Sequence, residues 1–219
     1  MVRIARVVIP GYPHHVIQRG NRRQVVFFNE DDKKLYLQIL NYHCRKESVE
    51  IWCYCLMDNH VHLIAVPSSV LSLAKAIGET HKRYTNMINI RENWTGHLWQ
   101  GRFLSYPLDE KHLYLAIGYI ERNPVRAGIV KKAENYSWSS AKAHVKRIPD
   151  AVLTEFYLTK QIKNWHYYLQ EEESEKDIEI FRSHERTGRP LGNNMFQARL
   201  EKITGRELRK GNAGRPRKK

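Results

Sequence analysis

The chain has 219 residues, which is enough for one catalytic-sized domain with an appendage or for two small domains. Lysine and arginine outnumber aspartate and glutamate by 37 to 23, and the resulting formal charge of +14 favours a polyanion as the partner. A hydrophobic share of 42% and an aromatic share of 11% exclude a wholly disordered or collagen-like chain.

The first part of the chain predicts a strand, a helix and a hairpin. Residues 12–18 are rich in β-forming side chains between a Pro-Gly and a Gly-Asn pair, which favours a strand. Apolar side chains at helical spacing over residues 31–46 indicate a helix that ends on basic residues. Residues 50–57 and 60–67 are expected to form two strands joined at a tight turn by Asp58-Asn59.

The next part predicts a second helix, a strand and a third helix. Residues 71–90 have helical spacing without an internal proline. Residues 96–106 are expected to be a strand, and a helix opens at Asp109 and must end before Pro124. The order β-α-β-β-α-β-α predicts an α+β fold, with an antiparallel sheet of the ferredoxin-like or RNA-recognition-like kind covered by helices. We assign this domain to residues 1–148.

The character of the chain changes after residue 148. We expect a helical region and an acidic linker over residues 149–198, with an aromatic amphipathic helix at 153–169. Residues 171–179 carry six acids against one lysine, which is typical of a linker. Residues 199–219 carry nine Lys or Arg against two Glu, which predicts a helical, basic C-terminal extension that ends in a DNA-binding tail.

Cysteine content and hydropathy predict a cytoplasmic location. Cys44, Cys53 and Cys55 are too few for a disulfide scaffold, so a reducing compartment is expected. The longest apolar runs, such as residues 113–120, are far shorter than the roughly 18 residues needed to span a bilayer. The N-terminus shows no export signal. We expect no membrane contact.

The first candidate site is His60-Val61-His62 in the second strand of the predicted hairpin. Residues i and i+2 of a strand point to the same face, so the two imidazoles could converge on one divalent ion while Val61 faces the core. Two histidines make only half of a metal site, and an H-x-H pair in a basic protein can equally line a solvated face of a sheet.

The second candidate site is Tyr119 with Asn123 on the third helix. The i, i+4 spacing places a phenol and an amide on one helix face, one turn apart. Opposite the histidine pair, Asn123 would add an oxygen ligand and Tyr119 an oxygen nucleophile. Taken alone, the same residues could be a core tyrosine and a cap before Pro124.

A rival metal site combines Cys53 and Cys55 with His60 and His62, because two thiolates and two imidazoles can bind zinc tetrahedrally. The predicted turn would place Cys55 opposite His62. The cysteines could equally be small apolar strand residues.

Three motifs together resemble the REP-associated tyrosine transposases, which belong to the HUH class of single-strand DNA transposases. They are Met-Asp-Asn-His-Val-His-Leu at residues 57–63, His-Leu-Trp-Gln-Gly-Arg-Phe at 97–103 and Tyr-Ile-Glu-Arg-Asn-Pro-Val-Arg-Ala-Gly at 119–128. The similarity spans about residues 10–145 and includes Tyr-Ser-Trp-Ser-Ser at 136–140. The resemblance implies the same ferredoxin-like or RNA-recognition-like sheet.

The resemblance also implies the roles of the site residues. His60 and His62 would be the metal-binding pair, Asn123 the third ligand and Tyr119 the nucleophile, with Mg²⁺ or Mn²⁺ as cofactor. The activity would be cleavage and rejoining of single-stranded, hairpin-bearing DNA through a 5′-phosphotyrosine. Two alternatives stay open: a non-catalytic DNA-binding protein on the same fold and a zinc-stabilised RNA-binding module. The sequence does not decide between a monomer and a dimer.

Basic residues interleaved with aromatic ones suit single-stranded DNA, where cations meet phosphates and bases stack. Gly214-Arg215-Pro216-Arg217 resembles the core of an AT-hook, although Ala213 replaces the arginine usual before the glycine. The residues expected to contact DNA are Arg19, Arg22, Arg23, Lys82, Arg83, Arg102, Arg215 and Arg217.

We predict that deleting the tail 199–219 weakens DNA binding most at low salt and flattens its salt dependence, while cleavage at saturating protein survives. If about four tail cations meet phosphates, log K falls by about 3 to 4 extra units per decade of salt. The measurement is a binding titration at several salt concentrations for both chains. An unchanged slope would show that the tail does not touch DNA.

Overall fold

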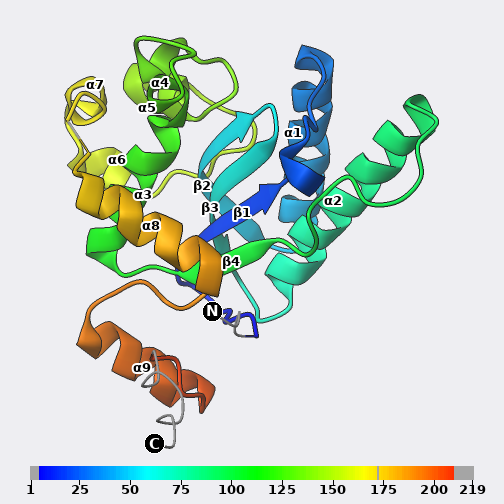
Figure 1. Cartoon of the computed structure of the whole chain (residues 1–219). Coiled ribbons are helices and arrows are strands. Elements are labelled where there is room, and N and C mark those ends of the chain that lie inside the picture. The colour runs from blue at the N-terminus through cyan, green and yellow to red at the C-terminus, as the bar shows by residue number, and fades with distance from the viewer. Residues whose placement is uncertain (1–4, 172, 210–219) are drawn as a thin grey trace, which may run out of the picture.

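A four-stranded sheet lies at the centre of the computed structural model, which describes residues 5–171 and 173–209 (Figure 1). Its strand order is β2-β3-β1-β4, and every neighbouring pair is antiparallel. The strands are β1 (His14–Arg19), β2 (Val49–Met57), β3 (His60–Pro67) and β4 (Leu104–Pro107). With helices between the strands, this is the ferredoxin-like arrangement, so the predicted α+β class is confirmed.

The side chains of β3 alternate between the two faces of the sheet. Val61 and Leu63 are buried in the core beneath the first two helices, whereas His60 and His62 line a cavity on the opposite face. Asp58 and Asn59 form the turn of the β2–β3 hairpin, and the register pairs Cys55 with His62. The predicted hairpin is therefore confirmed.

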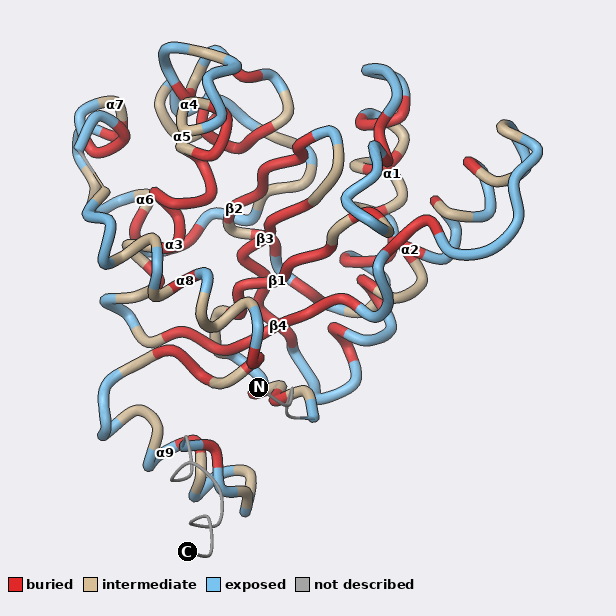
Figure 2. The backbone as a smooth tube through the Cα atoms, viewed as in Figure 1, coloured by how far each residue is buried: buried red, intermediate tan, exposed pale blue. Residues whose placement is uncertain are grey.

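Helices α1 (Glu30–Lys46) and α2 (Ser72–Arg91) cover one face of the sheet. Asn29 caps α1, because its side chain accepts a hydrogen bond from the backbone N–H of Asp32. Tyr36 of α1 and Tyr84 of α2 are fully buried between the helices and the sheet. Figure 2 shows the consequence, which is that the strands are buried while the outer sides of these helices are exposed.

The opposite face of the sheet is covered by α3 (Glu110–Glu121) and α8 (Glu175–Thr187) (Figure 1). Asp109 caps α3 by accepting a hydrogen bond from the backbone N–H of His112. The remaining helices are η1 (Asn21–Arg23), α4 (Asn123–Arg126), η2 (Ala133–Asn135), α5 (Ala141–Lys146), α6 (Tyr157–Gln161), α7 (Trp165–Tyr168) and α9 (Asn194–Thr204). None of the described helices has the length and apolar character needed to cross a lipid bilayer.

The structure corrects two of the predicted elements. Residues 96–106 were expected to be one strand, but β4 starts only at Leu104, because Gly96 and Gly101 have positive φ angles that interrupt an extended ladder. Residues 153–169 form α6 and α7 in place of one helix, because Asn164 caps the second of them by accepting a hydrogen bond from the backbone N–H of Tyr167.

The acidic stretch 171–179 is also not a simple linker, since its second half is the start of α8. Ser174 caps this helix, and Glu175 and Asp177 lie in its first turn, where negative charge is stabilised by the helix dipole. Phe181 then buries α8 against the sheet face that carries the histidine pair. The division into domains at residue 148 stays a prediction, but α8 covers the face that the first 148 residues build.

The predicted basic tail begins inside a packed element. Arg199 lies in α9, and the neighbouring Leu200 is buried with Leu208 against Val7 and Ile9 near the other end of the chain. Arg215 and Arg217 lie outside the described residues. The shortened chain that tests the tail should therefore keep residues 1–209, because removal of 199–209 would also expose this small apolar cluster.

Candidate active site

A cavity of about 900 Å³ opens between the sheet, α3 and α8. His60, His62, Tyr119 and Asn123 all line it, although they come from β3, α3 and α4. The structure thus brings together the four side chains that the sequence predicts for one site.

The two histidines point into the cavity from the same face of β3, with ring centroids 5.0 Å apart. Nδ1 of His60 lies 2.6 Å from the side-chain oxygen of Asn59, and Nε2 lies 3.3 Å from the side-chain amide of Asn123. Because the Asn59 oxygen accepts, His60 donates from Nδ1 and keeps a lone pair on Nε2. That nitrogen faces Asn123, as a shared metal site requires.

His62 is oriented by a second histidine and a tyrosine, which the sequence analysis missed. Its Nδ1 lies 2.9 Å from Nε2 of His15, and Nδ1 of His15 lies 2.8 Å from the hydroxyl of Tyr106. When His62 donates from Nδ1, its Nε2 keeps the lone pair that a metal ion needs. His15 and the distant Tyr106 form no sequence motif, so only the pairing of β1 with β3 and β4 brings them together with His62.

Burial lowers the pKa of each of these three histidines. The pKa of His60 falls to about 4 and that of His15 to about 3, and in both cases loss of solvent is the largest cause. Burial, with the neighbouring His60 and His15, lowers the pKa of His62 well below its usual value. All three rings are therefore neutral near pH 7, which is the form that binds a metal ion.

Tyr119 and Asn123 lie on the same helical face, although Tyr119 belongs to α3 and Asn123 to α4. The helix α3 ends at Glu121 and α4 begins at Asn123, but Arg122 between them keeps a near-helical conformation with φ −81° and ψ −4°. The backbone N–H of Arg122 donates to the carbonyl of Gly118 at 2.9 Å, and that of Arg126 donates to the carbonyl of Arg122 at 2.9 Å, so helical hydrogen bonds continue across the boundary. The predicted one-turn spacing therefore survives the break.

The ring of Tyr119 is held on both sides. It stacks on Phe181 of α8 with centroids 4.8 Å apart, and the guanidinium carbon of Arg126 lies 4.3 Å from its centroid. The hydroxyl donates a hydrogen bond of 3.2 Å to Oε1 of Glu185. Burial raises the pKa of Tyr119, and the Glu185 carboxylate raises it further, so the phenol is protonated near neutral pH.

Arginine side chains surround the cavity. Three of the predicted DNA-contact residues, Arg19, Arg23 and Arg102, line it. The helix α8 adds Arg182 and Arg186, which the sequence analysis missed. The cavity that holds the tyrosine and the histidines is therefore also lined by several cations.

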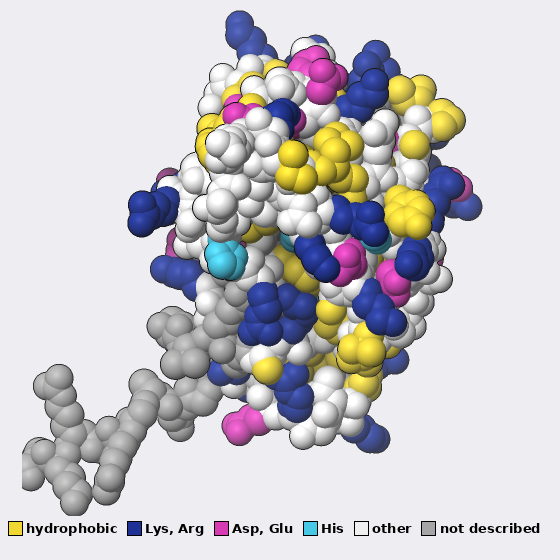
Figure 3. All heavy atoms as spheres, turned by 90° about the vertical axis from the view of Figure 1, so that its right-hand side faces the viewer, with side chains coloured by type: hydrophobic (Ala, Val, Ile, Leu, Met, Phe, Trp, Pro, Cys, Tyr) yellow, Lys and Arg dark blue, Asp and Glu magenta, His cyan; other side chains and the backbone are white. Residues whose placement is uncertain are grey.

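Among the described residues, the other predicted DNA-contact side chains do not line this cavity. Arg22 is exposed in η1, and Lys82 and Arg83 are exposed on α2. Figure 3 shows the face on the α2 side, where Lys and Arg side chains lie among exposed hydrophobic ones. Lys82 lines a second cavity of about 490 Å³, which shares Gln18 and Arg102 with the first one.

The contribution of α8 was missed because the acidic stretch before it was interpreted as a linker. One signal was available: Ile178, Phe181 and Glu185 recur at spacings of three and four, as in a helix with one buried face. Phe181 and Glu185 turn out to contact Tyr119. Spacing alone could not reveal which element this helix would cover.

The side chains present fit a small divalent cation. His60 and His62 can offer Nε2 atoms, and rotation of the Asn123 amide would offer its oxygen beside them. Such a set leaves positions for phosphate and water oxygens, which are ligands that Mg²⁺ and Mn²⁺ accept.

The zinc alternative is not supported. Cys53 and Cys55 are completely buried, and burial raises the pKa of both thiols. The described part of the chain contains no group of three or more His, Cys, Asp or Glu side chains that could hold a metal ion. The cysteines therefore act as small core residues, and a closed zinc site with His60 and His62 is wrong.

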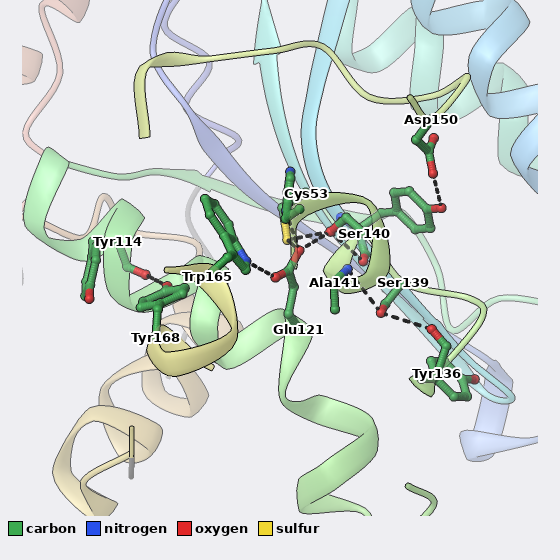
Figure 4. A network of polar contacts seen from close by, with 12 residues as sticks. Cys53, Tyr114, Glu121, Tyr136, Ser139, Ser140, Ala141, Asp150, Trp165 and Tyr168 are labelled. Atoms are coloured by element: carbon green, nitrogen blue, oxygen red, sulfur yellow. Dashed lines mark hydrogen bonds and ion pairs between the residues drawn. The ribbon is translucent and has the colours of Figure 1, made fainter. Parts of the chain in front are cut away.

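A buried carboxylate behind α3 fixes the orientation of the site (Figure 4). Glu121 is the last residue of α3 and is completely buried. Its oxygens accept hydrogen bonds from Ser140 Oγ at 2.5 Å, Trp165 Nε1 at 2.7 Å and His144 Nδ1 at 2.7 Å. Glu121 is two residues, or about 200° around the helix, from Tyr119, so these bonds hold the back of α3 while Tyr119 faces the cavity.

Comparisons with known proteins give a family and a similar fold. Over residues 9–123 the chain matches the model of the family described as "Transposase IS200 like". The fold is similar to the solved structure of a REP-associated tyrosine transposase bound to a REP hairpin, with 21% identity, a TM-score of 0.58 and coverage of 71% of this chain and 93% of that chain. A candidate transposase from Deinococcus radiodurans R1 has 20% identity over 55% of this chain and 97% of its own, with a TM-score of only 0.38. No curated protein matches the chain.

We predict that Glu121→Gln lowers the free energy of unfolding by about 1–3 kcal/mol. The glutamine amide would place an N–H donor where a carboxylate oxygen now accepts hydrogen bonds from Ser140, His144 and Trp165. Glu50→Gln is a matched control, since Glu50 also accepts from a tryptophan, Trp52 Nε1 at 2.8 Å, but at an exposed site. This control should change stability by less than about 0.5 kcal/mol. Urea unfolding of both variants is the measurement, and equal effects would contradict the anchoring role.

Proposed function

The chain belongs to the IS200-like transposase family, and on that premise we propose that it cleaves and rejoins single-stranded, hairpin-bearing DNA with Tyr119 as the nucleophile. The Tyr119 oxygen would attack the scissile phosphate and form a 5′-phosphotyrosine, leaving a free 3′-hydroxyl. The 3′-hydroxyl of a second strand end could then attack this ester and rejoin the DNA. The ester keeps the energy of the broken bond, so the reaction needs no nucleotide triphosphate.

The observation that carries this proposal is the position of Tyr119 in one cavity with the histidine pair. The ring centroids of Tyr119 and His62 lie 5.8 Å apart, and Asn123 lies beside His60. A nucleophilic oxygen close to a candidate metal site is the arrangement that in-line attack on a phosphodiester needs. The protonated phenol, the neutral imidazoles and the surrounding arginines are consistent with this chemistry.

We propose that His60, His62 and Asn123 hold Mg²⁺ or Mn²⁺. When bound, such an ion supplies positive charge to the phosphate oxygens as negative charge develops there. The chain's own contributions are to orient the imidazoles through His15 and to hold the ring of Tyr119 between Phe181 and Arg126. The side chains that surround the tyrosine also limit the access of water to its oxygen.

We propose a hairpin-bearing single strand as the substrate, with the cationic cavity taking the strand that is cut. Arg19, Arg23 and Arg102 line the cavity and would meet its phosphates. Lys82 and Arg83 on the outer face of α2 and Arg22 in η1 would contact DNA beyond the cut. The similar solved structure holds a REP hairpin, which supports a hairpin as the partner.

A non-catalytic DNA-binding role is the second candidate, because the cations alone would suffice for it. It gives no reason for Tyr119, Asn123 and the two histidines to line one cavity.

We propose the cytoplasm as the location, since three free cysteines, all buried, suit a reducing compartment.

We predict that Tyr119→Phe lowers DNA cleavage by more than about 10³-fold while DNA binding is retained, because only the nucleophilic oxygen is removed. Tyr114→Phe is the control, since Tyr114 lies on α3 but lines a different, smaller cavity, where its hydroxyl contacts Glu171. The measurement is denaturing electrophoresis of a protein-linked fragment after incubation with a hairpin oligonucleotide and Mg²⁺. Cleavage that survives Tyr119→Phe would contradict the nucleophile and favour another mechanism.

We predict that His62→Ala weakens Mn²⁺ binding by more than about 100-fold and abolishes metal-dependent cleavage, and that His60→Ala does the same. Mg²⁺ or Mn²⁺ should support cleavage better than Zn²⁺, because the site is mixed and open. The control is His166→Ala, since His166 pairs with Glu134 away from the main cavity. Titration calorimetry with Mn²⁺ gives the affinities, and unchanged binding in His62→Ala would exclude this pair as ligands.

A further inference from the structure

Glu185 is the carboxylate that contacts the hydroxyl of Tyr119. Its Oε1 accepts the phenol hydrogen bond at 3.2 Å, and its side chain is only 14% exposed at the inner surface of the cavity. It comes from α8, 66 residues further along the chain than Tyr119. Neither the sequence motifs nor the family match over residues 9–123 includes it.

A phenol in this cavity needs a group that accepts its proton before or during attack. Burial raises the pKa of Tyr119, so its hydroxyl is a poor nucleophile until the proton leaves. The imidazoles of His60 and His62 are proposed to hold the metal ion, and guanidinium groups cannot accept a proton at neutral pH. Among the described residues, Glu185 is the carboxylate whose hydrogen bond with this hydroxyl the structure records.

The surroundings of Glu185 suit a proton acceptor. Loss of solvent raises the pKa of its carboxyl, which makes the carboxylate a stronger base, and nearby arginines offset part of this rise. Arg19 Nη2 of β1 lies 3.9 Å from the second carboxylate oxygen of Glu185 and lowers its pKa. Arg126 of α4 and Arg182 of α8 lower this pKa as well. On the sheet side Glu185 faces Tyr106, whose pKa it helps to raise.

We propose that Glu185 is a further catalytic residue, the general base that takes the proton of Tyr119 during DNA cleavage. The proton moves from the phenol oxygen to Oε1 of Glu185, and the phenol oxygen forms a bond to phosphorus. The bond from phosphorus to the 3′-oxygen breaks, and its electron pair leaves on that oxygen, which takes a proton from water. During rejoining, the attacking 3′-hydroxyl gives its proton to water and its oxygen bonds to phosphorus, while the bond from phosphorus to the phenol oxygen breaks and that oxygen takes the proton back from Glu185.

This inference rests on the proposed function, since it assigns a partner to the Tyr119 nucleophile. It also gives α8 a role in the chemistry. Phe181 holds the tyrosine ring and Glu185, four residues later on the same helix, receives its proton. General base catalysis of this kind contributes about 10²–10⁴-fold to a rate.

The test compares Glu185→Gln with Glu175→Gln in the full chain. Glutamine keeps the shape and one acceptor oxygen of Glu185 but cannot take a proton. Glu175 is exposed in the first turn of the same helix and lies outside the lining of the cavity, so its replacement controls for a lost charge on α8. Under single-turnover conditions with a hairpin oligonucleotide and Mn²⁺, E185Q should form the covalent product at least about 100-fold more slowly, and E175Q should differ from the parent by less than about threefold.

The pH dependence separates a base from a residue that only shapes the site. The parent rate should level off once Glu185 is ionised, whereas the E185Q rate should keep rising as hydroxide replaces the base. Glu185→Asp, which keeps a carboxylate at a shorter reach, should cleave faster than E185Q. Because both variants disturb the same packing, this order remains informative if each is less stable than the parent.

Three results would overturn the inference: E185Q cleaving as fast as the parent or faster, E185Q cleaving at least as fast as E185D, or E185Q and the parent sharing one pH profile. Tyr119→Phe is assayed beside them. If Tyr119→Phe still cleaves, the proposed nucleophile fails. If it is inactive while E185Q is normal, only the role of Glu185 fails.

Discussion

The geometry of the cavity depends on the hydrogen bonds that the buried carboxylate of Glu121 accepts. A buried charge is costly unless donors surround it, and here Ser140, His144 and Trp165 each supply one. These donors come from segments that follow α3, so the carboxylate can be satisfied only when those segments have closed behind the helix. Closure at the back sets the rotation of α3, and that rotation turns Tyr119 toward the sheet. The hydrogen bonds of Glu121 and the position of Tyr119 therefore depend on each other through α3.

The sheet positions the residues on the other side of the cavity. Strict alternation along β3 sends Val61 into the core and both histidines into the cavity, so a shift of one residue in the register would exchange them. The central position of β1 between β3 and β4 supplies His15, which orients His62. The imidazoles are neutral because they are buried, and a neutral imidazole is the form that can bind a metal ion.

The balance of charge in the cavity differs from that of the whole chain. Arginines from β1, α4 and α8 surround a few carboxylates, and Glu185 is held among them. An incoming phosphate would find cations on several sides and a protonated phenol beside the histidine pair. Membership in the IS200-like transposase family agrees with this local charge pattern, since cations attract the negatively charged phosphates of a nucleic acid.

Local pattern in the sequence determined the parts of this protein that depend on neighbours in the chain. The spacing of His60 and His62 placed them on one strand face, and the spacing of Tyr119 and Asn123 placed them one turn apart, because strand and helix periodicities are local properties. The α+β class followed from the order of such elements. The tertiary structure alone decided that His15, Tyr106, Phe181 and Glu185 join the site, because strand pairing and helix docking bring together residues far apart in the sequence. The spacing of residues 178–185 indicated a buried helix face, but only packing against Tyr119 determined what that face covers.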